Sequence, residues 1–385
     1  MTGLLLPTRD GTLESWSPSG RTVPEAQAEQ PRSRIAYAAA HVVADPLAPG
    51  DPARSVVLDW DSTLAFRHHL WSCGLGVAEA MDTAQRGMGL DWAATQELIR
   101  RTGAAARESG GRWCAGVGTD QLPPGPSTVD KIVAAWREQL DLVSGEGAMP
   151  VIMASRALAA VASGPADYRS AYGKLLSGAE GTVLLHWLGE MFDPALAGYW
   201  GHSDVRAAAA ELASLCAEHA GVIAGVKVSV LDADVETEFR RALPEGVACY
   251  TGDDFNYPDL IAGDEQGHSE ALLGIFDPIA PVAGAALTRL DADDRAGFHE
   301  LIGPTVALSR EIFRAPTQHY KVGVVLLAWL NGHQPHFRMV GGLESARSIV
   351  HLADVLRLAD QAGVLTDPER AVARMRALLS VAGVE

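Results

Sequence analysis

The chain has 385 residues, of which 48% are hydrophobic and 21% are charged, a composition typical of a globular protein with a large core. Its 48 acidic and 31 basic residues give a formal net charge of −17, which disfavours binding to nucleic acid and to anionic membrane surfaces. The four cysteines lack CxxC spacing, so the sequence predicts neither a disulfide framework nor a thiolate zinc site. We therefore expect a protein of the reducing cytoplasm with no nucleic-acid and no membrane partner.

Residues 1–33 are rich in Pro, Gly, Ser and Thr, and turn signals at Asp10-Gly11 and Pro18-Ser19-Gly20 predict a small hairpin or arm before the main fold. The apolar run before Pro7 is short and no basic segment precedes it, so we expect no signal peptide. No later apolar run approaches the length of a membrane span.

From residue 34 onward, short apolar runs alternate with longer amphipathic segments. Eight runs have the length of a strand, at 35–40, 76–80, 112–117, 149–154, 182–187, 223–230, 247–251 and 271–275. Seven segments between them have the pattern of a helix, near 61–73, 91–109, 128–143, 166–177, 204–219, 233–242 and 256–263, and many begin after Asp, Ser or Thr. This alternation predicts parallel strands joined by right-handed helical crossovers.

Eight such units within residues 34–280 match the size of a closed (β/α)8 barrel, and this is the predicted fold. A doubly wound open sheet is the alternative, but no strand is followed by a G-x-G-x-x-G or P-loop motif. Residues 281–385 lack strand patterns and predict a helical C-terminal extension, with helices near 284–297, 304–313, 319–331, 344–361 and 367–381.

Lys227 lies in the middle of the apolar run 221–230 and is one of only four lysines in the chain. Burial lowers the pKa of a lysine, and the neutral amine is a nucleophile that can form a Schiff base with a carbonyl compound. The alternative is a structural lysine paired with a carboxylate at a strand end. The strand alone leaves both possibilities open.

In a parallel barrel, the residues that follow the strands meet at one rim, which is where the chemistry of such barrels takes place. We expect His186 to move protons to and from the Schiff base, and Asp253 to act with it. Arg156 is expected to bind a substrate carboxylate, although it could instead pair with Asp120 or Asp82. The remaining residues expected to bind substrate are Asp82, Thr83, Glu190, Ser229, Asp254 and His41.

Three segments resemble the dihydrodipicolinate synthase and N-acetylneuraminate lyase family of class I aldolases. Ala224–Ser229 is similar to the family's I-G-I-K-x-[AS] strand, whose lysine forms a Schiff base with pyruvate, so the resemblance implies this role for Lys227. The other two matches are Tyr250–Asp254 with Gly263–His268 and Gly274, and Ala315–Lys321 near the C-terminus. The resemblance covers roughly residues 34–335 and implies a barrel lyase that needs no cofactor beyond the lysine imine.

Two family features are absent from this sequence. His186-Trp187-Leu188-Gly189 stands where the family has a strand-five tyrosine that relays protons. Residues 81–87 replace the family's T-T-G-E loop, which binds the carboxylate of pyruvate. The resemblance therefore implies the lysine chemistry but does not indicate the substrate.

The predicted function is a lyase of the aldolase type that forms a lysine imine with a 2-keto acid or a keto sugar, a small-molecule carbonyl substrate. One alternative is a lyase or isomerase that acts on a sugar-derived substrate with a divalent metal ion held by Glu79, His186, Glu190 and Asp253. Another is a barrel that binds a ligand without catalysis. Apolar faces at 324–330 and at Leu352, Val355 and Leu356 predict a homodimer or homotetramer.

Overall fold

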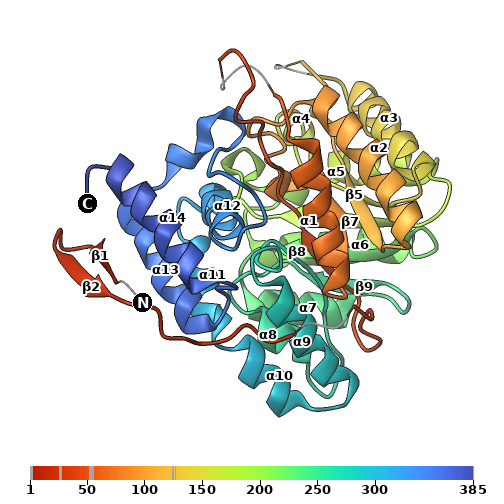
Figure 1. Ribbon diagram of the computed structural model, residues 1–385. Coiled ribbons are helices and arrows are strands. Elements are labelled where there is room, and N and C mark those ends of the chain that lie inside the picture. Colours follow the sequence, from red (N-terminus) through yellow and green to blue (C-terminus); the bar gives the residue numbers. More distant parts are fainter. Residues whose placement is uncertain (1–2, 26–27, 52–55, 124, 126, 385) are drawn as a thin grey trace.

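The computed structural model describes residues 3–25, 28–51, 56–123, 125 and 127–384 (Figure 1). Eight parallel strands form a closed barrel in the order β10-β3-β4-β5-β6-β7-β8-β9. Their bounds are β3 Ala36–Ala39, β4 Gly76–Glu79, β5 Trp113–Val117, β6 Met149–Ile152, β7 Val183–Leu188, β8 Ile223–Ser229, β9 Ala248–Thr251 and β10 Glu270–Leu273. The predicted (β/α)8 barrel is confirmed, and each predicted strand run overlaps one strand.

Helices follow the strands and cover the outside of the barrel (Figure 1). Their bounds are α1 Trp60–Ser72, α2 Trp92–Ser109, α3 Val129–Gly145, α4 Arg156–Ala159, α5 Pro165–Leu176, α6 Val205–Glu218, α7 Ala233–Ala242 and α8 Tyr257–Ala262. Asp59, Asp91, Thr128 and Asp204 cap four of them with their side chains, as expected for residues that satisfy free N–H groups at a helix start. The sequence pattern did not predict the short helix α4.

The strands are apolar on both faces because one face meets the helices and the other fills the barrel. Val226 and Val228 of β8 belong to the outer core, whereas Gly225, Lys227 and Ser229 alternate with them and face inward. The interior is packed by side chains such as Tyr37, Cys114, Val151, Leu184 and Tyr250. Lys227 is therefore part of a filled barrel, near the carboxyl end of its strand.

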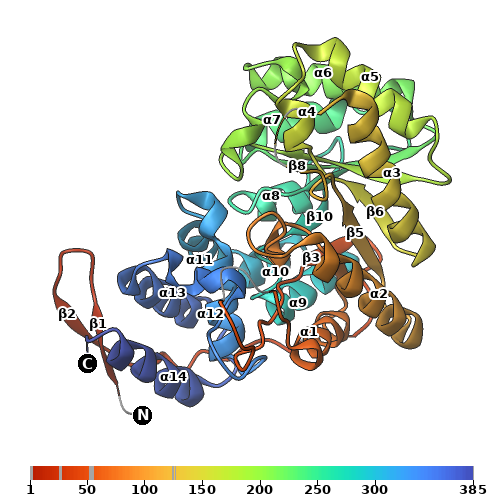
Figure 2. The same cartoon turned by 90° about the horizontal axis from the view of Figure 1, so that it is seen from above.

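The C-terminal region contains six helices within the described residues: α9 Ala280–Asp291, α10 Arg295–Ile302, α11 Thr305–Ile312, α12 Lys321–Leu330, α13 Ile349–Ala362 and α14 Pro368–Val381. The helix predicted at 284–297 is wrong, because α9 ends at Asp291 and α10 begins at Arg295. Between them Asp293 has a φ of 56°, and the side chain of Asp294 caps the next helix at Gly297. Figure 2 shows α11, α12, α13 and α14 grouped on one side of the barrel.

The N-terminal segment contains an antiparallel hairpin of β1 Leu4–Pro7 and β2 Leu13–Trp16. It lies beside the C-terminal helices in both overall views (Figures 1 and 2). Arg357 of α13 donates hydrogen bonds to the carbonyls of Leu6 and Pro7, and Leu4 and Leu6 are buried. The hairpin is therefore attached to the C-terminal helices rather than to the barrel.

The apolar faces that suggested an oligomer are covered within the single chain. Residues 324–328 of α12 are all buried, and so are Leu352, Val355 and Leu356 of α13. The argument from these faces is therefore wrong, and a homodimer or homotetramer stays a prediction without this support. Within the described part of the chain, the helices are too short or too polar to cross a membrane.

Candidate active site

Lys227 reaches a small cavity at the carboxyl-terminal rim of the barrel. Residues from several strand ends and from the C-terminal region line this cavity: Ala39, Met81, Asp82, Thr83, Leu188, Phe192, Ser229, Asp254, Gly274 and Tyr320 surround Lys227. Its volume is about 10 Å³, which is room for a single water-sized group. A reacting carbonyl fits beside the amine, but most of a substrate must lie elsewhere.

Gly252, the residue after strand β9, allows the lysine to occupy this position. A Cβ atom at Gly252 would lie 2.9 Å from Cε of Lys227 and 2.2 Å from Oγ of Ser229. Only glycine leaves room for the close approach of this backbone to both side chains.

The ammonium of Lys227 is buried without a direct partner. Only 7% of the residue is exposed, and among the described residues no hydrogen bond or ion pair reaches its Nζ. Burial lowers the pKa of Lys227 from 10.5, and the charges of Asp82 and Asp254 partly oppose this effect. The site therefore increases the fraction of neutral, nucleophilic amine.

Asp254 and Asp253 have different environments although they are adjacent. Asp254 lines the cavity, and burial raises its pKa from 3.8 to about 7. Its Oδ1 accepts a hydrogen bond from the backbone N–H of Ile275 at 2.9 Å. Asp253 does not line the cavity; its carboxylate accepts hydrogen bonds from Phe255 N and from both nitrogens of Asn256. Of the two neighbouring carboxylates, Asp254 lines the cavity with Lys227 and Asp253 does not; the catalytic role expected for Asp253 stays a prediction.

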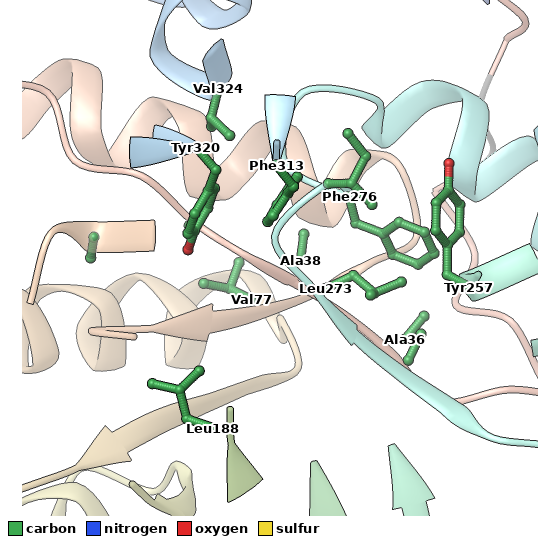
Figure 3. Close-up of a cluster of buried hydrophobic side chains, with 14 of the residues drawn as sticks. Ala36, Ala38, Val77, Leu188, Tyr257, Leu273, Phe276, Phe313, Tyr320 and Val324 are labelled. Atoms are coloured by element: carbon green, nitrogen blue, oxygen red, sulfur yellow. The ribbon is translucent and has the colours of Figure 1, made fainter. Parts of the chain in front are cut away.

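Tyr320 is the main residue of the cavity that the sequence did not indicate. It precedes helix α12, and its hydroxyl makes a 2.8 Å hydrogen bond with Oγ1 of Thr83. Its ring stacks on Phe313 with centroids 4.3 Å apart, and Figure 3 shows both side chains above the barrel strands. Burial raises the pKa of Tyr320 well above 10, so the phenol carries its proton at neutral pH. The segment Ala315–Lys321, which resembles the aldolase family in sequence, contains this tyrosine.

His186 lies inside the barrel but not at the cavity wall. It pairs with Lys227 in the strand register, and its Nε2 is 3.2 Å from Oγ of Ser229. Burial lowers its pKa well below 6.5, and Nδ1 has no hydrogen-bond partner in the part of the chain that the structure describes. A neutral imidazole at this position can orient Ser229, which does line the cavity, but it has no direct route to a bound substrate.

A larger cleft of about 630 Å³ adjoins the cavity and shares Asp82 and Leu188 with it. Arg156, at the start of helix α4, lies in its wall and makes an ion pair with Asp193 at 2.5 Å. The expected alternative partners of Arg156 were Asp120 and Asp82, but Asp120 pairs with Arg86 instead. The side chain of Arg156 is 54% exposed and remains accessible from the cleft.

Three expected rim residues lie away from the cavity. His41 is buried between Asp277, at 2.8 Å from Nδ1, and Gln334, at 3.1 Å from Nε2. Glu190 is exposed. The carboxylate of Glu79 accepts two hydrogen bonds from Arg67, each at 2.8 Å. These side chains are either occupied by other partners or turned to solvent.

The alternative metal site is not formed. Glu79 is bound to Arg67, Asp253 to its own turn and His186 to Ser229, so the four proposed ligands do not converge. No group of three or more His, Cys, Asp or Glu side chains within the described residues is arranged to hold a metal ion.

A second buried lysine, Lys321, lies close to the site and was not singled out by the sequence. Its Nζ is 3.1 Å from the carbonyl of Gln318 and 4.4 Å from the ring centre of Tyr320. Burial lowers its pKa from 10.5 to about 8. Unlike Lys227, this amine has a hydrogen-bond acceptor within the protein.

A family model described as "Protein of unknown function (DUF993)" matches residues 4–384. The chain belongs to this family. None of the curated proteins matches its sequence.

Among solved structures, a putative dihydrodipicolinate synthetase from Pseudomonas aeruginosa is similar, with a TM-score of 0.65 and 13% identity over 86% of this chain and 99% of that one. The 4-hydroxy-tetrahydrodipicolinate synthase from Methylacidiphilum fumariolicum SolV has a TM-score of 0.64 and 13% identity over 90% and 99% of the chains. The protein CdNal from Clostridium difficile, solved with mannosamine, has a TM-score of 0.61 and 14% identity over 89% and 98%. These likenesses confirm the resemblance in fold that the sequence motifs indicated.

Proposed function

We propose that this protein is a Schiff-base lyase in which Lys227 condenses with the carbonyl of a 2-keto acid. The observation that carries the proposal is the Lys227 amine, which is buried, lacks a hydrogen-bond or ion-pair partner among the described residues and faces a cavity with Asp254 and Tyr320. Buried lysines are rare in proteins unless they are paired or functional. The similar structures named as dihydrodipicolinate synthases support the proposal through their fold alone.

The chemistry assigns one role to each group. The neutral amine of Lys227 attacks the carbonyl carbon, after the carboxylate of Asp254 has taken the proton that the ammonium loses. The C=O oxygen then leaves as water after it has received two protons through the phenol of Tyr320. One of these protons is replaced by the proton that the attacking nitrogen loses and the other by the proton held on Asp254, so the phenol and the Asp254 carboxylate are both restored. The resulting protonated imine withdraws electrons from the adjacent C–C or C–H bond, which allows cleavage, condensation or dehydration.

Thr83 and Ser229 complete the site by orienting other groups. The Thr83 hydroxyl holds the Tyr320 phenol at the cavity, and Ser229 links the cavity to His186. In this proposal, the C-terminal extension supplies an acid that the barrel strands lack.

Reductive trapping tests the proposal directly. The protein is incubated with pyruvate and other 2-keto acids in the presence of cyanoborohydride, and its intact mass and peptides are measured. We expect one reduced adduct per chain, located at Lys227. An absence of adducts with every keto acid, in a protein with the expected circular dichroism, would refute imine formation and leave the non-catalytic binding barrel as the better function.

A further inference from the structure

The cleft beside the Lys227 cavity is the space in which most of a substrate must lie. The cavity holds about 10 Å³, whereas the cleft holds about 630 Å³, within the range of sites for small organic ligands. Asp82 and Leu188 line both spaces, so a molecule bound to Lys227 has its continuation in the cleft.

The wall of the cleft is predominantly apolar. Its apolar residues include Met153, Ala157, Ala160, Leu188 and Leu196, which lie in or directly after β6, α4 and β7 and in the 3-10 helix Pro194–Leu196. Binding becomes more favourable when such a surface covers an apolar group of the ligand, whereas covering a hydroxyl group contributes little.

Four of the five charged side chains in the wall are paired with one another, and the fifth, Asp82, lies where the cleft meets the Lys227 cavity. Arg86 forms an ion pair with Asp120 at 2.6 Å and also bonds to Gln139. Arg156 is paired with Asp193.

Thr119 is the one residue with a hydroxyl side chain among the described residues that line the cleft, and this hydroxyl also has a partner. The hydroxyl of Thr119 makes a 2.7 Å hydrogen bond with Oγ of Ser155. A sugar chain would bring several hydroxyl groups into a wall with few free partners, and each unpaired one would cost binding free energy.

We infer that the cleft binds an apolar group of the substrate, about the size of an aromatic ring or a branched aliphatic chain. The substrate class is then a 2-keto acid with such a group beyond its carbonyl carbon, rather than a keto sugar. This inference rests on the proposed function, because Lys227 fixes which end of the substrate enters the cavity. Asp82 lies at the junction and marks the polar end of the bound molecule.

Cyanoborohydride trapping with three probes tests the inference. Pyruvate has no group for the cleft, 2-oxo-4-phenylbutanoate has an aromatic one, and 2-keto-3-deoxygluconate has a hydroxylated one. We expect half-maximal labelling of Lys227 at a concentration at least about tenfold lower for the phenyl compound than for pyruvate. The deoxygluconate should be no better than pyruvate. Equal labelling by pyruvate and the phenyl compound, or tighter labelling by the deoxygluconate, would overturn the inference.

A cleft-filling variant locates the effect. Ala160 is exposed and lines the cleft, so Ala160→Trp should fill it without disturbing the core. We expect the ratio between the half-maximal concentrations of pyruvate and the phenyl compound to fall to less than about threefold in this variant. Ser163→Trp is the matched control, because Ser163 is exposed nearby but does not line the cleft, and it should keep the full ratio. If Ala160→Trp keeps the full preference for the phenyl compound over pyruvate, the apolar group binds elsewhere and the inference is contradicted.

Calorimetry with alcohols that cannot form an imine separates the inference from the proposed function. The pair is 2-hydroxy-4-phenylbutanoate and lactate. If no keto acid labels the protein but the phenyl alcohol binds at least tenfold more tightly than lactate and Ala160→Trp removes this gain, the cleft inference holds and imine formation fails. If pyruvate labels Lys227 but the phenyl keto acid labels no better than pyruvate and the phenyl alcohol binds no more tightly than lactate, imine formation holds and the cleft inference fails. If neither labelling nor binding is found, both are refuted.

Discussion

Two strands of the barrel each end with a buried charge, and the protein treats the two charges differently. At the end of β4, the Glu79 carboxylate accepts hydrogen bonds from Nε and Nη2 of Arg67, from the hydroxyl of Thr102 at 2.7 Å and from the N–H of Ala80 at 2.9 Å. Near the end of β8, the amine of Lys227 has no hydrogen bond or ion pair among the described residues.

The difference separates a structural charge from a functional one. A buried charge whose hydrogen bonds are all made stabilises one arrangement of the chain relative to structures in which it is unpaired. A buried charge without partners lowers stability, and the wild-type chain keeps it beside a cavity in which a ligand can use it. The following four predictions test this distinction.

Lys227→Met should have the largest effect on reactivity. Removal of the amine should abolish labelling by every 2-keto acid with cyanoborohydride, because no nucleophile remains in the cavity. The midpoint of urea unfolding should be unchanged or higher, since an unpaired buried charge is replaced by an apolar side chain of similar length. Lys321→Met is the control and should still be labelled at Lys227. Labelling that persists in Lys227→Met would show that another amine reacts.

Glu79→Gln should have the largest effect on stability. It leaves the Arg67 guanidinium buried without its counter-charge, so we expect a loss of about 3 to 5 kcal/mol in the free energy of unfolding, measured with urea. Glu97→Gln is the matched control, because Glu97 and Arg101 form an exposed pair at 2.7 Å on α2. Its loss should stay below about 0.5 kcal/mol. Similar losses in the two variants would contradict the comparison.

Tyr320→Phe should slow labelling of Lys227 by roughly 100-fold, a size typical of the removal of a general acid. The rate constant of adduct formation with pyruvate measures this effect. Tyr257→Phe is the control, because its hydroxyl is also buried and bonded to a threonine, Thr305, at 2.5 Å but does not line the cavity. Equal rates for the Tyr320 variant and the wild type would assign the phenol a packing role only.

Glu236 provides the smallest of the predicted effects, a change in the pH dependence of stability. Its carboxylate accepts hydrogen bonds from Ser269 at 2.7 Å and Thr251 at 3.0 Å, and burial raises its pKa from 4.5 to about 8. The folded state therefore binds a proton that the unfolded state releases, so the stability contributed by this group falls as pH rises from 4.5 to 8.

Glu236→Gln removes this titrating proton. Between pH 5 and pH 8, the unfolding free energy of the variant should fall less than that of the wild type, by an amount on the order of 1 to 3 kcal/mol. Urea unfolding at the two pH values measures the difference. A variant with the same pH dependence as the wild type would show that Glu236 has an ordinary pKa in the folded protein.

The eight barrel strands, the seven helices predicted between them and four of the six C-terminal α-helices described could be predicted from sequence. Strands buried on both faces are short continuous apolar runs, and many of the helices begin with capping residues. The break between α9 and α10 was missed. The helical pattern continues through residues 292–294, and only the left-handed backbone of Asp293 shows where the chain turns.

The sequence also indicated five of the residues around the cavity, namely Lys227, Asp82, Thr83, Ser229 and Asp254, because strand ends meet at one rim. Their roles stay predictions. Which of the neighbours Asp253 and Asp254 faces the cavity depends on the backbone of a single turn, which composition does not specify. Tyr320 reaches the cavity only because helices α11 and α12 pack against the barrel, a contact between segments far apart in the chain.

The sequence by itself determined the barrel and the strand that carries the lysine, because the period of buried side chains is a local property of the chain. The tertiary structure alone decided that the amine has no partner in the described part of the chain, that the phenol of Tyr320 lines the same cavity and that an apolar cleft adjoins it. Those features depend on distances between side chains brought together by packing, and no local pattern encodes them.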